Sequence, residues 1–78
     1  SVYDATAIIA KTASDYAIAL ESLTVSQTYI VASGTAPDKG ALNKLETALQ
    51  SQGYTTKLQQ NASSRNAWTF TLEGTAQP

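Results

Sequence analysis

The sequence lacks several residue types on which protein chemistry commonly depends. Its 78 residues include no cysteine, no histidine and no methionine, and charged residues make up only 14%. Without cysteine, no disulfide, zinc finger or iron-sulfur cluster can form, so stability must come from packing. Without histidine, a Ser-His-Asp triad, a Cys-His pair and an imidazole metal site are excluded. Most routes to enzyme chemistry are therefore closed, and we expect that the chain is not an enzyme.

Charge of either sign is scarce and dispersed, with a formal net charge of -1. The basic residues stand singly at Lys11, Lys39, Lys44, Lys57 and Arg65. Nonspecific nucleic-acid binding draws on clustered cations, so we expect no nucleic-acid partner. The carboxylates are those of Asp4, Asp15, Glu21, Asp38, Glu46 and Glu73. Their spacing matches no catalytic pair and no hard-cation site, so we expect them to cap helices or face water, without metal or cofactor.

Long apolar runs are also missing. No stretch approaches the roughly 18 apolar residues that cross a bilayer, and no basic-then-apolar leader opens the chain. The chain starts at Ser1 rather than at a methionine, so we expect a processed chain or a piece of a longer protein. Any membrane contact is expected only through a segment outside these residues.

Two segments carry the spacing of amphipathic helices. Residues 2–15 place alanine and isoleucine at three- and four-residue steps, and Asp4 can cap their start; a mobile tail of helical composition is the alternative. Pro37 and Asp38 predict the first turn of a second helix, and Gly53 predicts its end. The buried stripe of this second helix is expected to comprise Ala41, Leu42, Leu45, Ala48 and Leu49.

Alternation predicts two strands in the first half of the chain. Residues 18–25 alternate, but the phase slips by one near residues 21–22, as a β-bulge would produce. A helix that runs on through Leu23 is the alternative. Residues 28–36 are rich in β-branched and aromatic side chains, which predict a strand, and residues 26–27 would form the turn between them.

The second half of the chain has the same order of elements. Residues 54–60 and 67–73 alternate as strands, and the polar residues 61–66 are predicted to form the loop between them. The order αββαββ predicts one α+β domain over residues 1–78, in which both helices cover one face of a four-stranded antiparallel sheet. This is a permuted ferredoxin-like fold. The inner face is expected to collect Ile18, Leu20, Ile30, Ala32, Leu58, Trp68, Phe70 and Leu72.

Aromatic residues divide between the expected core and the expected surface. Trp68 and Phe70 share the only strongly apolar face of their strand, so we assign them to the core rather than to a base-stacking platform. A buried phenol needs a hydrogen-bond partner, whereas an interfacial phenol keeps water. Tyrosines are therefore the better candidates for a partially exposed partner surface, and we single out Tyr16, Tyr29 and Tyr54.

A family resemblance is carried by several segments of the chain. The segment Ile18-Ala-Leu-Glu-Ser-Leu-Thr-Val25 has an "L-x-x-L" rhythm, and Tyr29-Ile-Val-Ala-Ser-Gly-Thr-Ala36 ends in "G-x-A". A leucine-rich helix over 42–52 leads to Gly53-Tyr54, and Trp68-Thr-Phe-Thr-Leu72 closes the pattern. Over nearly its whole length the chain resembles the periplasmic domain of PilN-type fimbrial assembly proteins, and the same module occurs in the related GspL and GspM.

This resemblance implies an assembly role in a type IV pilus or type II secretion machine. It implies the periplasmic domain of a bacterial inner-membrane protein, which pairs with itself or with a sister domain. Two alternatives remain. A ring-building or BON-like cell-envelope domain shares part of the pattern, but the additional strand over 68–72 argues against it. A small ligand-binding domain would require an enclosed polar pocket.

Overall fold

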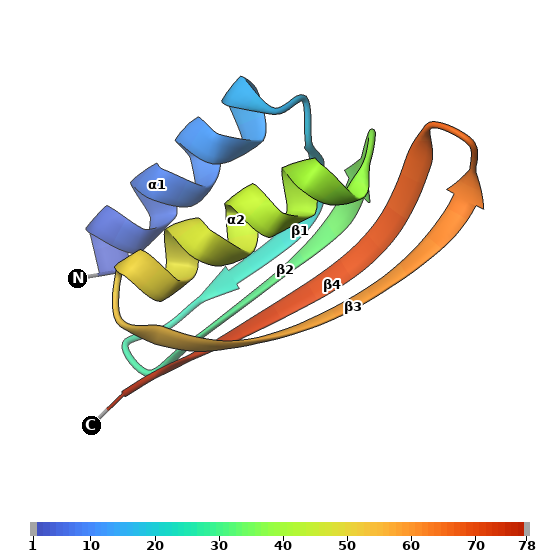
Figure 1. Ribbon diagram of the computed structural model, residues 1–78. Helices are drawn as coiled ribbons and strands as arrows, with labels where there is room; N and C mark the ends of the chain where they lie inside the picture. Colours follow the sequence, from blue (N-terminus) through green and yellow to red (C-terminus); the bar gives the residue numbers. More distant parts are fainter. Residues whose placement is uncertain (1, 78) are drawn as a thin grey trace.

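The computed structural model describes residues 2–77 as two helices packed on one face of a four-stranded antiparallel sheet (Figure 1). The elements are α1 (Val2–Asp15), β1 (Ala19–Val25), β2 (Tyr29–Ala36), α2 (Lys39–Ser51), β3 (Tyr54–Ser64) and β4 (Ala67–Ala76). The strand order is β1-β2-β4-β3, so the last strand of the chain lies inside the sheet. The predicted αββαββ order and the α+β, ferredoxin-like fold are confirmed.

The end of α1 decides between the two interpretations of the residues that follow it. Ala17 adopts a left-handed conformation with φ 57°, and the Ile18 N–H donates to the Ala13 carbonyl oxygen at 2.9 Å. A left-handed residue followed by such a six-residue hydrogen bond is the usual way for a helix to stop. The helix therefore does not run on through Leu23, and that alternative is wrong.

The predicted β-bulge is present in β1. Its register against β2 shifts between Leu20 and Ser22, which leaves Glu21 as the extra residue. The two backbones approach closely here, since a Cβ added at Gly34 would lie 2.0 Å from the Ala19 carbonyl oxygen. Glycine at position 34 is thus required by the closeness of a neighbouring strand.

The turn between β1 and β2 is one residue longer than the sequence predicts. β2 begins at Tyr29 rather than at Thr28. The hydroxyl oxygen of Ser26 accepts hydrogen bonds from the backbone N–H groups of Thr28 at 3.3 Å and Tyr29 at 3.1 Å. A serine side chain therefore supplies the hydrogen bonds that stabilise this turn.

The helix α2 begins at Lys39, two residues later than its proline suggests. Asp38 is the N-cap, in an extended conformation, and its Oδ1 accepts a hydrogen bond from the Ala41 N–H at 2.8 Å. Pro37 precedes the cap instead of lying in the first turn. At the other end Gln52 is the C-cap, and Gly53 follows it with φ 89°. Each end of α2 is therefore fixed by a residue suited to that position.

The predicted loop over residues 61–66 is wrong. β3 continues to Ser64, and only residues 65–66 form the turn into β4. Asn61 pairs with Thr69, whose hydroxyl also donates to the Asn61 carbonyl oxygen at 3.3 Å. Residues 61–66 are all exposed, so their polar side chains stay in water. Polar side chains do not prevent strand pairing when the backbone groups have hydrogen-bond partners. The result is a long hairpin that extends past the helices (Figure 1).

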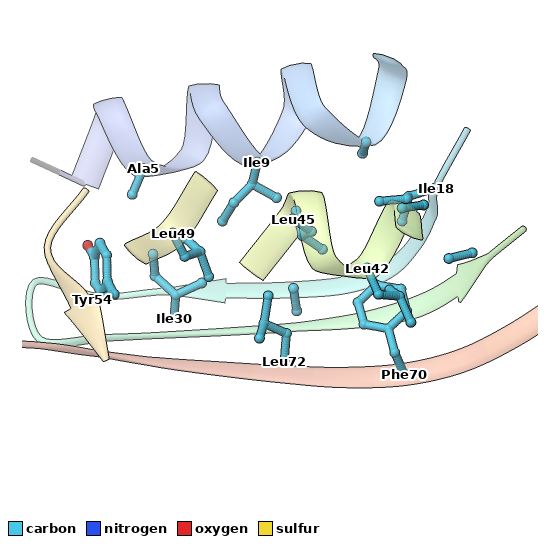
Figure 2. Packing of buried hydrophobic residues seen from close by; sticks show 14 residues of the cluster. Ala5, Ile9, Ile18, Ile30, Leu42, Leu45, Leu49, Tyr54, Phe70 and Leu72 are labelled. Carbon is cyan, nitrogen blue, oxygen red and sulfur yellow. The ribbon is translucent and has the colours of Figure 1, made fainter. Parts of the chain in front are cut away.

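The core lies between the sheet and the two helices. Its fully buried large side chains are Ile9, Ile30, Leu42, Leu45, Leu49 and Leu72. Figure 2 shows the α1 and α2 side chains pointing toward those of β2 and β4. Each such side chain contributes about 1.5–3 kcal/mol when it leaves water. Burial of the leucine stripe is thus confirmed, except that Ala48 is only partly buried.

The expected inner face of the sheet is confirmed in its centre and only partly at its margins. Ile18, Ile30, Ala32, Phe70 and Leu72 are buried. Leu20, Leu58 and Trp68 are partly buried and pack against the core from outside it. They lie on edge strands or toward the projecting hairpin, where the helices give less cover. The Lys39 ammonium covers part of the Trp68 ring, 4.8 Å from its centroid.

Candidate interaction surfaces

The three tyrosines singled out from the sequence do not form one surface. Tyr16 follows α1 and is 41% exposed, and Tyr29 opens β2 and is 46% exposed. The two lie at opposite ends of the domain, because the chain after α1 pairs with the far end of β2, where Ala19 is opposite Thr35.

Tyr54 is a buried tyrosine, with only 8% of its surface exposed. Its ring lies beside Leu49 and Ile30 in Figure 2, because the start of β3 runs beneath the end of α2. The expectation that Tyr54 is partially exposed is wrong. Tyr3, by contrast, is 86% exposed on α1. An interaction role for Tyr16 and Tyr29 stays a prediction.

The helices leave the opposite face of the sheet uncovered (Figure 1). The strand residues of this face are rich in hydroxyl groups. Successive strand pairs place Ser33 opposite Thr71 and Thr35 opposite Thr69, and the Ser22 and Ser33 hydroxyls lie 2.6 Å apart. Charge on this face is balanced where Lys57 stands opposite Glu73. This face is therefore polar but close to neutral. It offers hydrogen bonds rather than an electrostatic field.

The two edges of the sheet differ in how accessible they are to another strand. β1 is short, seven residues, and its bulge at Glu21 interrupts the regular ladder. β3 is 11 residues long, and its pairing with β4 is regular from Tyr54 to Ala62. Both edge strands lack proline and carry one charge, Glu21 in β1 and Lys57 in β3. A bulge protects an edge, so β3, which is longer and regular over more residues, is the less protected one.

Several acidic side chains have structural roles, and one of them, Glu46, is partly buried rather than facing water as expected. Asp38 caps α2, and Glu46 accepts a hydrogen bond from the Thr56 hydroxyl at 2.8 Å. Asp15 pairs with Lys11 at 2.7 Å, and this hydrogen-bonded carboxylate raises the pKa of Lys11. Within residues 2–77, acids do not gather into a group of three that could hold a metal ion. No helix in the described part of the chain is long and apolar enough to cross a membrane.

A surface hollow of about 590 Å³ lies where the start of α1 meets the end of α2 and the end of β4. Its lining comprises Tyr3, Gln27, Gln52, Gly53, Tyr54, Ala76 and Gln77. These residues carry amides and phenols but no carboxylate or ammonium group. The hollow therefore lacks the convergent titratable groups of an acid-base catalytic site.

Comparison with solved structures gives one informative likeness. The fold is similar to the crystal structure of the periplasmic domain of XcpY. The TM-score is 0.71 at 16% sequence identity, and the match covers 95% of this chain and 99% of that one. No model of a known protein family matches the chain, and no curated protein matches it in sequence. At this identity the likeness establishes the fold over almost the whole length of both chains.

The likeness supports the fold that was expected from the sequence. The fold implied by the family resemblance is present, and a periplasmic domain shares it. Reasoning from the sequence missed the β3 edge as the prominent feature of the surface. No local signal could have identified it, because residues 19–25 also lack proline and carry a single charge, and the strand order decides which strands are edges.

Proposed function

We propose that this chain is a non-catalytic protein-protein interaction module of a bacterial type IV pilus or type II secretion assembly platform. The observation that carries the proposal is the shared fold with the periplasmic domain of XcpY, which extends over nearly all of both chains. The segments over 18–25, 29–36 and 68–72, which resemble the PilN/GspL kind, support the same assignment.

The distribution of polar groups supports a binding role. The open face of the sheet carries hydroxyl side chains with almost no net charge, and the β3 edge offers unpaired backbone groups. Such surfaces suit contact with another folded protein better than contact with a charged polymer. We expect the partners to be a second copy or a sister domain, with Tyr16 and Tyr29 at the margins of contact.

The same likeness supports a proposed location. We place the domain in the periplasm, as part of an inner-membrane protein whose membrane segment lies outside these 78 residues. A hydroxyl-rich, weakly charged composition fits this compartment. The BON-like alternative is weaker, because the strand that distinguishes it, β4, is central to the sheet.

The proposal is tested by loss of the protein in the bacterium that encodes it. We expect deletion of the gene to abolish surface pili or to stop export of the secreted enzymes, and a plasmid copy to restore them. A plasmid copy that carries Gly34→Ala, which disrupts β1–β2 packing, serves as the matched control and should not restore them. Normal piliation and secretion in the deletion strain would contradict the proposal.

A further inference from the structure

One buried phenol has no hydrogen-bond partner in the protein. Tyr54 is only 8% exposed, and its ring packs in the core beside Leu49 (Figure 2). Its hydroxyl group nevertheless makes no hydrogen bond with another group of residues 2–77. A buried tyrosine hydroxyl usually has such a partner, because a polar group that leaves water without one costs free energy. The partner of this hydroxyl therefore comes from outside the chain.

The Tyr54 hydroxyl opens onto the surface hollow that this residue lines. The oxygen is not closed off from the surface, and the hollow measures about 590 Å³. In Figure 2 the oxygen lies at the end of the ring that points away from β4. Sites for small molecules have volumes of roughly 300–1,000 Å³. The hollow therefore has the size of a ligand site, with an unsatisfied polar group facing it.

The main chain around this hollow is held by hydrogen bonds between separate elements. The Ala76 N–H donates to the Thr28 carbonyl oxygen at 2.8 Å, and the Gln77 N–H donates to the Gly53 carbonyl oxygen at 3.3 Å. These bonds connect the end of β4 to the β1–β2 turn and to the residue after α2. The site is thus formed before a ligand arrives, which lowers the entropic cost of binding.

The side chains of the hollow are amides and phenols. Those of Gln27 and Gln52 make no hydrogen bond within residues 2–77. Gln77 donates from its amide nitrogen to the Thr55 hydroxyl, which leaves its side-chain carbonyl oxygen as an acceptor. Each amide combines donors with an acceptor. The Tyr3 ring, 86% exposed, adds an apolar surface beside them.

This chemistry selects a neutral ligand. The lining holds no Lys or Arg to bind a phosphate or carboxylate, and no Asp or Glu to bind a cation. Sugar hydroxyls both donate and accept hydrogen bonds, as the amides and the free phenol do. The C–H face of a sugar ring can pack against an aromatic ring. A peptide fits less well, since Ala76 is the only aliphatic side chain in the lining and offers no pocket for a peptide side chain.

We infer that this hollow binds a neutral sugar, which packs against the Tyr3 ring and forms hydrogen bonds with the Tyr54 hydroxyl and the amides of Gln27 and Gln52. The inference goes beyond the proposed function and does not depend on it, because it rests on the hollow alone.

NMR titration of the isotopically labelled chain with neutral sugars tests the site. The probes are N-acetylglucosamine and its trisaccharide, chitotriose. We expect both to shift the side-chain amide signals of Gln27 and Gln52. The indole signal of Trp68 should stay unchanged, because Trp68 lies near the start of β4 and the hollow lies at its end. Tighter binding of the trisaccharide assigns a glycan chain as the source of the sugar, and equal binding assigns a free sugar.

Tyr54→Phe removes only the unpartnered hydroxyl. We expect the dissociation constant for chitotriose to rise about fivefold, the effect of one lost hydrogen bond. The free energy of unfolding should not fall, because the hydroxyl has no partner in the folded chain. Tyr16→Phe, at the opposite end of the domain, is the matched control and should change neither quantity.

The exposed ring of Tyr3 is tested by a pair of variants. Tyr3→Ala should raise the dissociation constant several-fold, because the sugar loses its apolar contact. Tyr3→Phe keeps the ring and should bind as the wild type does. Both variants should retain the circular dichroism spectrum of the wild type, since the side chain contributes little to the core.

Three results would overturn the inference. The first is unchanged amide signals of Gln27 and Gln52 at tens of millimolar sugar. The second is a loss of stability in Tyr54→Phe, which would show that the hydroxyl has a partner in the folded chain. The third is an equal response to tetraglycine, which would exclude selection for a sugar. The assembly role is tested separately by the deletion strain, and neither result decides the other.

Discussion

The Thr56 hydroxyl donates a hydrogen bond to Oε2 of Glu46 at 2.8 Å and so connects β3 to α2. The same hydroxyl oxygen accepts a hydrogen bond from the Gln50 side-chain amide at 2.9 Å. One threonine thus joins two successive turns of the helix to the edge strand. It holds α2 over the edge strand β3.

Removal of this hydroxyl should loosen the contact between α2 and β3. We expect Thr56→Val to lower the free energy of unfolding by about 1–2 kcal/mol, because the partly buried Glu46 carboxylate loses its donor. Urea unfolding followed by Trp68 fluorescence measures the change. Thr75→Val, at an exposed strand position, should have almost no effect. An equal decrease in the free energy of unfolding in the two variants would show that the Thr56–Glu46 hydrogen bond does not stabilise the fold.

Glycine should be more favourable than alanine at position 17, the left-handed residue after α1. Ala17→Gly is expected to raise the free energy of unfolding by about 0.5–1 kcal/mol, because glycine adopts φ 57° without the steric cost that a Cβ adds. Ala10→Gly, at an exposed position inside α1, should instead lower it by about 1 kcal/mol. Thermal unfolding by circular dichroism measures both. A loss of stability in both variants would contradict the assigned helix end.

The cap of α2 should contribute a measurable part of the stability. Asp38→Ala removes the acceptor of the Ala41 N–H, so we expect a loss of about 1 kcal/mol. Asp38→Asn keeps a side-chain oxygen at the cap and is expected to retain most of that stability. Amide hydrogen exchange in the first turn of α2 should quicken in the alanine variant alone. Unchanged exchange there would show that another group caps the helix.

Replacement of Gly34 or Gly53 by alanine should lower the free energy of unfolding, for a different reason at each position. At Gly34 the added Cβ meets the Ala19 carbonyl oxygen at 2.0 Å, so we expect a loss of more than about 3 kcal/mol or failure to fold. At Gly53 nothing lies within 4 Å of the added Cβ, and the strain comes only from φ 89°. Gly53→Ala should therefore lose about 1–2 kcal/mol. Similar losses at both positions in chemical denaturation would rule out the close approach of β1.

Much of the fold could be predicted because its local signals agree with its packing. The leucine spacing of α2 has one consistent interpretation, and the phase slip near Glu21 agrees with a β-bulge, although a continued helix was the alternative; the helix α2 and the bulge are both present in the structure. The hairpin beyond Gln60 could not be predicted in the same way. Asn61 and Ser64 have no apolar alternation, and their strand conformation comes from pairing with β4 rather than from their own preference.

The candidate surface was harder to predict than the fold. Tyr54 was assigned to the surface by its phenol, although it shares the strand face of Thr56 and Leu58 and so faces the helices. The alternation over 54–60 already contained that information. Which strand becomes an edge depends on the order β1-β2-β4-β3, and no local pattern states that order.

The central place of β4 also governs when this protein can fold. β4 is the last of the four strands to be synthesised, yet within the sheet it is the strand that joins the β1–β2 pair to β3. Before β4 is available the two halves therefore have no common sheet, and the core cannot close until residues 67–76 are free. We expect nascent chains that stop before residue 67 to remain sensitive to protease, and the domain to form once residues 67–76 have left the ribosome.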